Sequence, residues 1–288
     1  MIQNKFIQLV ECPRDAMQGW KHFIPTVQKV DYINQLLEVG FHTIDFGSFV
    51  SPKAIPQMAD TKEVLQQLNL TNTTSRLLAI VANERGALDA CSFDVIQYLG
   101  FPFSVSPTFQ IRNTNSTQEE SWKRLTSIHT LCKQHNKQLV VYLSMGFGNP
   151  YGDTYSSELL LEWAHKMAEE GIEIVSLADT VGVANPDQIF NAFSTLVPAY
   201  PNMVWGAHLH ATQNFWKEKL EAAIAGGCTR MDTAILGIGG CPMAADDLVG
   251  NMATEWVLSY FEEKGISTSI NTAAWQKATI IAAKIFRN

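Results

Sequence analysis

Eight short runs of β-branched and aliphatic residues alternate with helical segments along this chain, and this alternation most limits what it can fold into. Strands separated by helices predict parallel pairing, since a crossover helix returns each strand to the same edge. The eight expected strands are Phe6–Glu11, His42–Phe46, Arg76–Ala82, Tyr98–Val105, Gln138–Ser144, Glu173–Ala178, Met203–His208 and Thr229–Ala234.

The segments between these runs carry helical signals. Val30–Val39 and Ser157–Glu170 place apolar residues at i, i+3, i+4 and i+7, the spacing of one helix face. Gly171 follows the second segment as an expected C-cap, and Asn185 with Pro186 opens another helix with a cap and a first-turn proline.

Eight such units favour an α/β fold of the (β/α)₈ TIM-barrel type. A barrel of this kind occupies about 250 residues, so residues 1–288 are expected to form one domain. Residues from about Ala244 onward predict extra C-terminal helices. An open doubly wound sheet is the alternative, but no GxGxxG motif follows the first strand, which argues against a dinucleotide site.

Composition excludes several classes of function. The net charge of −7, with no cluster of Lys and Arg, argues against nucleic-acid binding. No apolar run reaches the roughly 18 residues of a membrane span, and the N-terminus lacks a signal-peptide pattern. The 5 cysteines are odd in number and form no CxxC pair, so we expect neither a disulfide framework nor a structural zinc site, and a reducing cytoplasmic location.

Polar residues gather where the expected strands end. The C-terminal ends of barrel strands carry the chemistry of these folds. Arg14 and Asp15 follow the first strand, Asp45 lies in the second, Asp179 follows the sixth, and His208 ends the seventh. The pattern therefore predicts an active site at this end of the barrel.

His208 and His210 are two residues apart, which places both imidazoles on one face of an extended strand. Two neutral imidazoles form a natural metal chelate, to which Asp15 and Asn251 can add oxygen ligands. This mixed set suits Mg²⁺ or Mn²⁺. The alternatives are a pair of core or surface histidines and a solvated turn aspartate.

Four further residues are candidates for catalysis. Arg14 can stabilise a developing oxyanion, or form a structural ion pair. Asp45 and Asp179 are unusual residues for strands and can act in catalysis or hold loop backbones. Cys241, in the loop Gly237–Pro242, can donate a proton or act as a nucleophile, or be an incidental buried thiol.

Several segments resemble the 3-hydroxy-3-methylglutaryl-CoA lyase family of metal-dependent barrel enzymes. Val10–Gln18 looks like that family's VEVGPRDGLQ, Ser48–Asp60 is similar to SFVSPKWVPQMAD, and Ser176–Val183 to SLGDTIGV. Gly237–Pro242 is similar to GLGGCP and Gly250–Glu255 to GNVATE. The resemblance runs from about residue 6 to residue 260.

The resemblance implies a metal-dependent carbon–carbon lyase that cleaves an acyl-CoA thioester, 3-hydroxy-3-methylglutaryl-CoA, to acetyl-CoA and acetoacetate. Its reaction serves leucine degradation or ketone-body formation, and such barrels are often homodimers. It implies the metal ligands Asp15, His208, His210 and Asn251. The implied catalytic residues are Arg14, Cys241 and the site carboxylates Asp179 and Glu255. We expect either Asp15 or His208 to act as the base that takes the hydroxyl proton.

Three departures from the family pattern stand out. Asp45 replaces a glutamate, Ala211 replaces the aspartate of HCHDT, and Met243–Gly250 is about one residue longer. They leave open two alternatives: a related aldolase or acyl-CoA lyase acting on another hydroxy acid, and a catalytically silent barrel.

Overall fold

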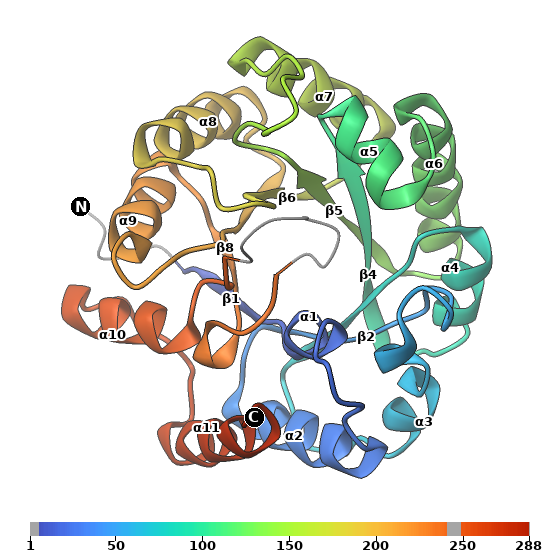
Figure 1. Cartoon of the computed structure of the whole chain (residues 1–288), viewed down its shortest axis with the longest axis vertical. Coiled ribbons are helices and arrows are strands. Elements are labelled where there is room, and N and C mark those ends of the chain that lie inside the picture. The colour runs from blue at the N-terminus through green and yellow to red at the C-terminus, as the bar shows by residue number, and fades with distance from the viewer. Residues whose placement is uncertain (1–5, 241–248, 288) are drawn as a thin grey trace.

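In the computed structural model, which describes residues 6–240 and 249–287, eight parallel strands follow one another in chain order and close into a barrel. Figure 1 looks down this barrel, with the strands in the centre and the helices around them. The last strand pairs with the first, with Gln8 opposite Arg230 and Glu11 opposite Thr233. The predicted TIM barrel is confirmed, and the open sheet is wrong.

The strands lie close to their expected positions, with ends that shift by a few residues. They are β1 (Gln8–Glu11), β2 (Thr43–Ser48), β3 (Arg76–Ile80), β4 (Ile96–Ser104), β5 (Gln138–Ser144), β6 (Ile174–Ala178), β7 (Val204–His208) and β8 (Arg230–Thr233).

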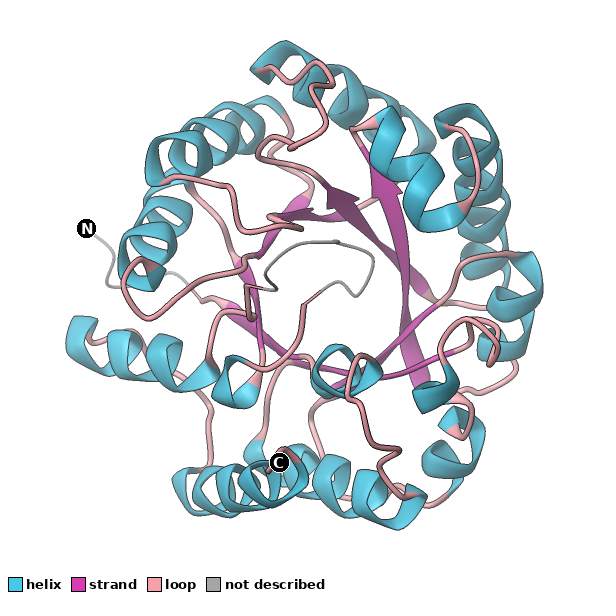
Figure 2. Ribbon diagram, viewed as in Figure 1, coloured by secondary structure: helices cyan, strands magenta, loops and turns pink. Residues whose placement is uncertain are grey.

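Helices form the outer layer, drawn in cyan in Figure 2. They are α1 (Pro13–Gln18), α2 (Thr26–Val39), α3 (Thr61–Gln66), α4 (Glu84–Cys91), α5 (Pro107–Thr114), α6 (Gln118–Gln134), α7 (Ser157–Glu170), α8 (Pro186–Ala199), α9 (Trp216–Gly226), α10 (Thr254–Lys264) and α11 (Thr272–Ile285), with short 3₁₀ turns at Pro56–Met58 and Ile235–Gly237. The helices α10 and α11 confirm the expected C-terminal addition. Among the described residues, no helix combines the length and apolar character needed to cross a membrane.

The local sequence signals explain several helix ends. Asn185 accepts a hydrogen bond from the backbone of Gln188, whose side chain bonds back to the Asn185 backbone, and Pro186 occupies the first turn of α8. Gly171 ends α7 in the left-handed conformation, at φ 82°, which glycine adopts without steric cost.

Two of the differences from expectation have a clear local cause. Arg14 and Asp15, expected only to follow the first strand, lie in the short helix α1, because Pro13 sets a helical φ at its first position. The third strand ends at Ile80 rather than Ala82, because Asn83 adopts an extended conformation and caps α4 through its side chain.

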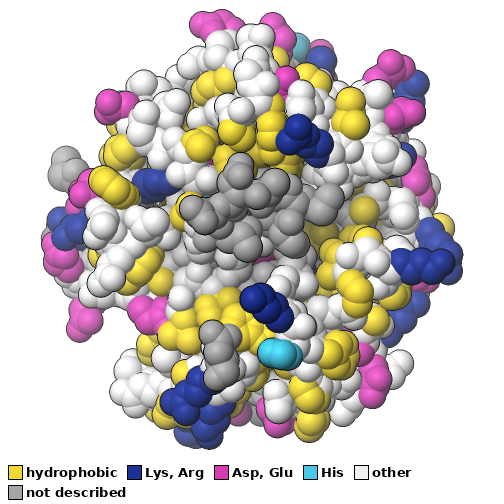
Figure 3. Space-filling model, in the orientation of Figure 1, with side chains coloured by type: hydrophobic (Ala, Val, Ile, Leu, Met, Phe, Trp, Pro, Cys, Tyr) yellow, Lys and Arg dark blue, Asp and Glu magenta, His cyan; other side chains and the backbone are white. Residues whose placement is uncertain are grey.

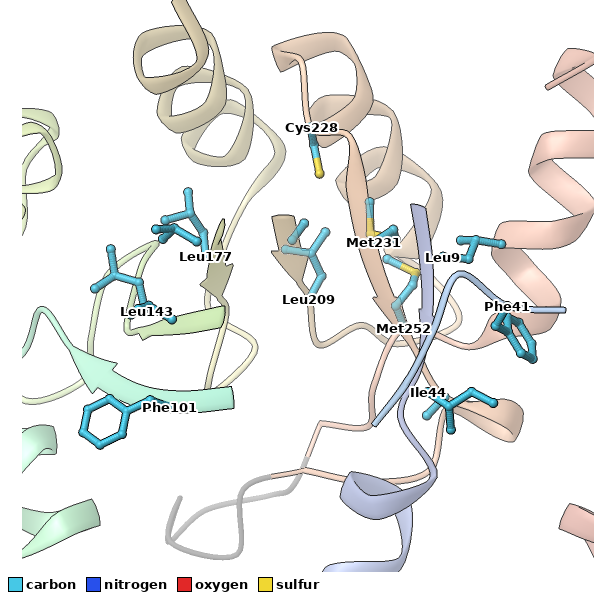
Figure 4. Close-up of a cluster of buried hydrophobic side chains, with 14 of the residues drawn as sticks. Leu9, Phe41, Ile44, Phe101, Leu143, Leu177, Leu209, Cys228, Met231 and Met252 are labelled. Atoms are coloured by element: carbon cyan, nitrogen blue, oxygen red, sulfur yellow. The ribbon is translucent and has the colours of Figure 1, made fainter. Parts of the chain in front are cut away.

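Two hydrophobic cores occupy opposite faces of the strands, because successive side chains of a strand alternate between faces. The larger core lies between barrel and helices, and Figure 4 labels members such as Leu9, Leu143 and Met231 on three different strands. The smaller core comes from strands alone and fills the barrel interior. Its members are Leu78, Ile80, Tyr98, Val140, Tyr142 and Ile174.

Candidate active site

The two histidines of the HxH motif lie together at the carboxyl end of β7. His208 is the last residue of the strand, and His210 forms an isolated antiparallel bridge with Asn251. Their ring centroids are 5.3 Å apart. His210 is buried, and the side chain of His208 is 14% exposed. The strand end therefore brings both imidazoles and Asn251 into one site.

Each histidine uses its Nδ1 for an interaction with the protein. Nδ1 of His208 lies 3.1 Å from Oδ2 of Asp232, and Nδ1 of His210 lies 2.7 Å from the carbonyl oxygen of Val249. With Nδ1–H donating to these acceptors, both Nε2 atoms present lone pairs, the arrangement common to metal-ligating histidines. Burial lowers the pKa of His210. Burial also opposes protonation of His208, but the hydrogen bond to Asp232 and the negative charges of Asp232 and Asp15 together outweigh it and raise the pKa of His208.

Asp15 reaches the site from α1 and contacts Asn251. Its Oδ2 accepts a hydrogen bond of 2.7 Å from Nδ2 of Asn251, and its Oδ1 accepts from Nη1 of Arg14 at 3.0 Å and from Gln18 at 2.8 Å. Burial opposes ionisation, but the Arg14 guanidinium, the two histidines and the hydrogen bond from Asn251 together outweigh it and lower the pKa of Asp15. Asp15 is therefore a carboxylate at neutral pH.

These residues fit a divalent cation. Oδ1 of Asn251 is buried and has no hydrogen-bond partner among the described residues, so a hard acceptor is left over beside a carboxylate and two imidazoles. Gly239 leaves room for them: a Cβ there would lie 2.2 Å from Nδ2 of Asn251 and 2.9 Å from Oδ2 of Asp15. Asp15, His208, His210 and Asn251 could together hold the ion.

A second group of ligand-type atoms lies behind His208. Cys12, His208 and Asp232 have potential ligand atoms within 4.8 Å of one another. Burial raises the pKa of the Cys12 thiol well above its ordinary value, so it remains protonated and is a poor ligand. Asp232 contacts Nδ1 of His208, the ring nitrogen that is not available to a metal ion. We therefore interpret this group as support for the chelate rather than as the chelate itself.

Arg14 links Asp15 to Asp45. Its Nε lies 3.2 and 3.0 Å from the two carboxylate oxygens of Asp45, and its Nη2 also donates to Oδ2. Burial raises the pKa of Asp45 to about 6, while Arg14 opposes the rise. Asp45 thus holds the guanidinium of Arg14 beside the carboxylate of Asp15. The aspartate side chain, although one methylene shorter than the glutamate of the family pattern, makes this contact.

Asp179 forms a buried ion pair that the sequence did not predict. Nζ of Lys219 on α9 lies 2.7 Å from Oδ2 of Asp179, and it also donates to the carbonyl oxygens of His210, at 2.8 Å, and Gly182, at 3.3 Å. Oδ1 of Asp179 accepts from the backbone of Ala184. Asp179 therefore organises the loop beside the chelate, as one of the two sequence interpretations proposed.

The remaining predicted residues lie away from these contacts. Glu255 is half-buried at the start of α10, where both of its oxygens accept from the backbone of Leu236 at 3.1 Å. Cys241 lies outside the described residues, as does most of Met243–Gly250. The structure thus places Glu255 in the first turn of α10, where it holds the backbone of the segment after β8 at Leu236.

Two acidic residues were missed. Asp232, in β8, orients His208. Glu11, in β1, is fully buried between Thr254 and the backbone of Ile235, and burial raises its pKa to about 8. An acidic residue within a strand was the available signal for both, and it was applied only to Asp45 and Asp179.

On the face shown in Figure 3, acidic side chains lie mainly toward the rim, basic side chains lie both at the rim and near the centre, and hydrophobic side chains are exposed among them.

Comparison with known proteins identifies consistent relatives. The family model described as HMGL-like matches residues 7–280. The mitochondrial hydroxymethylglutaryl-CoA lyase of Arabidopsis thaliana is 31% identical over 93% of this chain, which spans 57% of that protein's length.

Solved structures agree. An HMG-CoA lyase from Bacillus subtilis has a TM-score of 0.91 and 30% identity, covering 99% of this chain and 95% of its own. An HMG-CoA lyase from Acinetobacter baumannii, solved with coenzyme A and 3-methylmalate, has a TM-score of 0.89 and 31% identity, covering 97% of this chain and 91% of its own.

Proposed function

The chain belongs to the HMGL-like family, and from this premise we propose that it is a carbon–carbon lyase that cleaves 3-hydroxy-3-methylglutaryl-CoA to acetyl-CoA and acetoacetate. The observation that carries this proposal is the meeting of Asp15, His208, His210 and Asn251 beside Arg14 at the carboxyl end of the barrel. A relative with coenzyme A bound supports a thioester substrate.

The reaction requires removal of a proton from a tertiary hydroxyl and stabilisation of an enolate. A divalent ion bound at this site would act as a Lewis acid toward the substrate hydroxyl. His208 or Asp15 would take the hydroxyl proton. The bond between the carbinol carbon and the thioester α-carbon then breaks, and the hydroxyl becomes the ketone of acetoacetate.

Arg14 would stabilise the other product as it forms. Its guanidinium is held by Asp45 and Asp15 and therefore needs no reorganisation when negative charge develops on the thioester oxygen. The enolate carbon then receives a proton, from Cys241 or a histidine, to give acetyl-CoA.

The ligand set favours Mg²⁺ or Mn²⁺, because it mixes carboxylate and amide oxygens with imidazole and includes no ionised thiolate. We further propose a homodimer, which the family resemblance implies, and a cytoplasmic location, which the cysteine pattern favours.

The test is a product assay. The purified full chain, treated with a chelator, is mixed with 3-hydroxy-3-methylglutaryl-CoA with and without Mn²⁺, and acetoacetate and acetyl-CoA are measured. We expect both products in equal amounts only with Mn²⁺, and none from His210→Ala. Absence of both products from metal-loaded, folded protein would refute the proposal.

A specific observation supports a second candidate. Ala211 is 5% exposed and places a methyl group where the family has a carboxylate, directly after His210. This change favours a related lyase acting on another hydroxy-acid thioester. Assays with homologous thioesters lacking or extending the 3-methyl group, at equal concentration, distinguish this candidate by their kcat/KM values.

A further inference from the structure

A fully buried arginine lies inside the barrel, and no described residue forms an ion pair with it. Arg230 in β8 is 0% exposed, and its Nε and Nη2 have no hydrogen-bond partner among the described residues. Its Nη1 makes only long contacts, 3.4 Å to Gln8 and 3.3 Å to Thr43. Burying an unsatisfied cation costs several kcal/mol, roughly, so Arg230 calls for an explanation.

Neighbouring strands place other unsatisfied polar groups at the same level. Strand pairing sets four residues of β5 to β8 side by side, each opposite the next: Tyr142, Ser176, Gly206 and Arg230. The Tyr142 hydroxyl and Ser176 Oγ also have no partner within the described part of the chain. Gly206 keeps this level open, since a Cβ there would lie 3.0 Å from Ser176 Oγ and 3.4 Å from Cβ of Arg230.

One layer of inward-facing side chains closer to the active site lies Asp232, the residue that orients His208. Asp232 is two residues beyond Arg230, so both side chains point into the barrel. Oδ2 of Asp232 meets Nδ1 of His208, whereas its Oδ1 is buried with no partner in residues 6–240 and 249–287. The guanidinium of Arg230 and Oδ1 of Asp232, neither of them fully hydrogen-bonded, are therefore neighbours on the inward face of β8.

We propose that Arg230 is a positioning residue for the chelate: its Nε and Nη2 bind internal water that also donates to Oδ1 of Asp232, and this fixes the carboxylate that orients His208. Water suits this place because donors and acceptors are mixed there, and a buried water makes about three hydrogen bonds. An anion is disfavoured, because the Asp232 carboxylate would repel it.

The competing interpretation is that Arg230 only fills space. Its guanidinium lies 5.4 Å from the ring of Tyr98, a distance typical of a cation–π contact. Arg76 provides a matched control, since it lies 5.9 Å from the same ring and donates to the Tyr98 hydroxyl at 2.6 Å, but sits at the exposed start of β3.

The experiment measures Mn²⁺ binding to the full chain without substrate, by electron paramagnetic resonance of free Mn²⁺. Arg230→Met keeps an unbranched, flexible side chain but removes the guanidinium group and its charge. We expect its Mn²⁺ affinity to fall about 10–100-fold, the usual effect of losing a group that orients a metal ligand. Arg76→Met should bind as the unchanged protein does, and Arg230→Lys should recover part of the affinity.

Unchanged Mn²⁺ affinity in folded Arg230→Met, or an equal loss in Arg76→Met, would overturn the proposal. If Arg230→Met does not fold, a high-resolution crystal structure of the unchanged protein decides: water joining Arg230 to Oδ1 of Asp232 supports it, and a direct ion pair or a dry contact overturns it.

This role rests on the proposed function only through the metal. If the protein releases no acetoacetate but Arg230→Met still weakens Mn²⁺ binding, the lyase activity is refuted and the positioning role of Arg230 stands. A protein that binds no Mn²⁺ at all would overturn both the chelate and this role.

Discussion

The two sides of the barrel interior differ sharply in chemistry. The side built by β1, β2, β7 and β8 carries charged groups, among them Asp45, His208, Arg230 and Asp232, with Arg14 above them. The side built by β3 to β5 is mostly apolar, with side chains such as Leu78, Ile80 and Val140. The same fold thus holds a charged network and a hydrophobic wall facing each other.

This difference shows how a barrel can keep charges buried near its active site. Nearly all the charged groups contact one another, as Arg14 does with Asp45 and Asp15, because unpaired buried charges are costly. The apolar wall lowers the polarity of the interior, and electrostatic interactions are stronger in less polar surroundings. The chemistry is therefore expected on the charged side, with the wall supplying stability.

The largest expected effect on activity comes from removing Arg14, the cation on the charged side of the barrel. Arg14→Met should lower turnover by about 10²–10³-fold, because it removes a preorganised group for the enolate oxygen. Arg14→Lys keeps the charge but loses the two-pronged contact with Asp45, so its turnover should lie between that of Arg14→Met and that of the unchanged protein. Steady-state acetoacetate release measures the effect. Near-normal turnover by Arg14→Met with bound Mn²⁺ would remove Arg14 from the mechanism.

Breaking the apolar side should affect stability rather than metal binding. Leu78 is 0% exposed inside the barrel, so Leu78→Ala should lower the free energy of unfolding by about 2–5 kcal/mol. Leu88→Ala on α4, where the side chain is 50% exposed, is the control and should change it little. Denaturant unfolding and Mn²⁺ titration measure both. A loss of Mn²⁺ affinity comparable to that of a chelate variant would contradict the division between the two sides.

Asp232, which orients His208, allows a test of how Mn²⁺ affinity depends on a residue behind the metal ligands. Asp232→Asn keeps the shape of the side chain but removes the charge next to Nδ1 of His208. Mn²⁺ affinity should fall about 10–100-fold while the chain stays folded. Asp31→Asn, an exposed carboxylate on α2, should have no effect. Equal affinities in the two variants would show that His208 needs no carboxylate to orient it.

The smallest effect at neutral pH is expected at Glu11, a buried carboxyl on the outer face of β1. Its pKa is about 8 in the folded chain against an ordinary value of 4.5, so its contribution to stability is full below 4.5 and is lost as the pH rises through about 8. Glu11→Gln should therefore unfold with less dependence on pH over this range. Urea unfolding at several pH values measures it, with exposed Glu38→Gln as control; parallel pH curves for Glu11→Gln and the unchanged chain would contradict a neutral Glu11.

The sequence predicted those features that follow from local pattern. Strand periodicity and helix caps specify the barrel, and polar strand ends placed Asp15, His208, His210 and Asn251 together. Lys219 and Arg230 were not predicted, because a lysine on a helix and an arginine in a strand show no local sign of being buried. Their roles depend on neighbours 40 residues away, as for Asp179 with Lys219, or on the level of the barrel that the register sets.

Asp15 and Asn251 are 236 positions apart and meet across the pairing of β1 with β8. The site thus straddles the seam at which the ring of strands is completed. No fragment that lacks either end of the barrel can assemble it, and during synthesis it can arise only after the last strand has been made. Ligand affinity at this seam is consequently a gauge of whether the whole ring has closed.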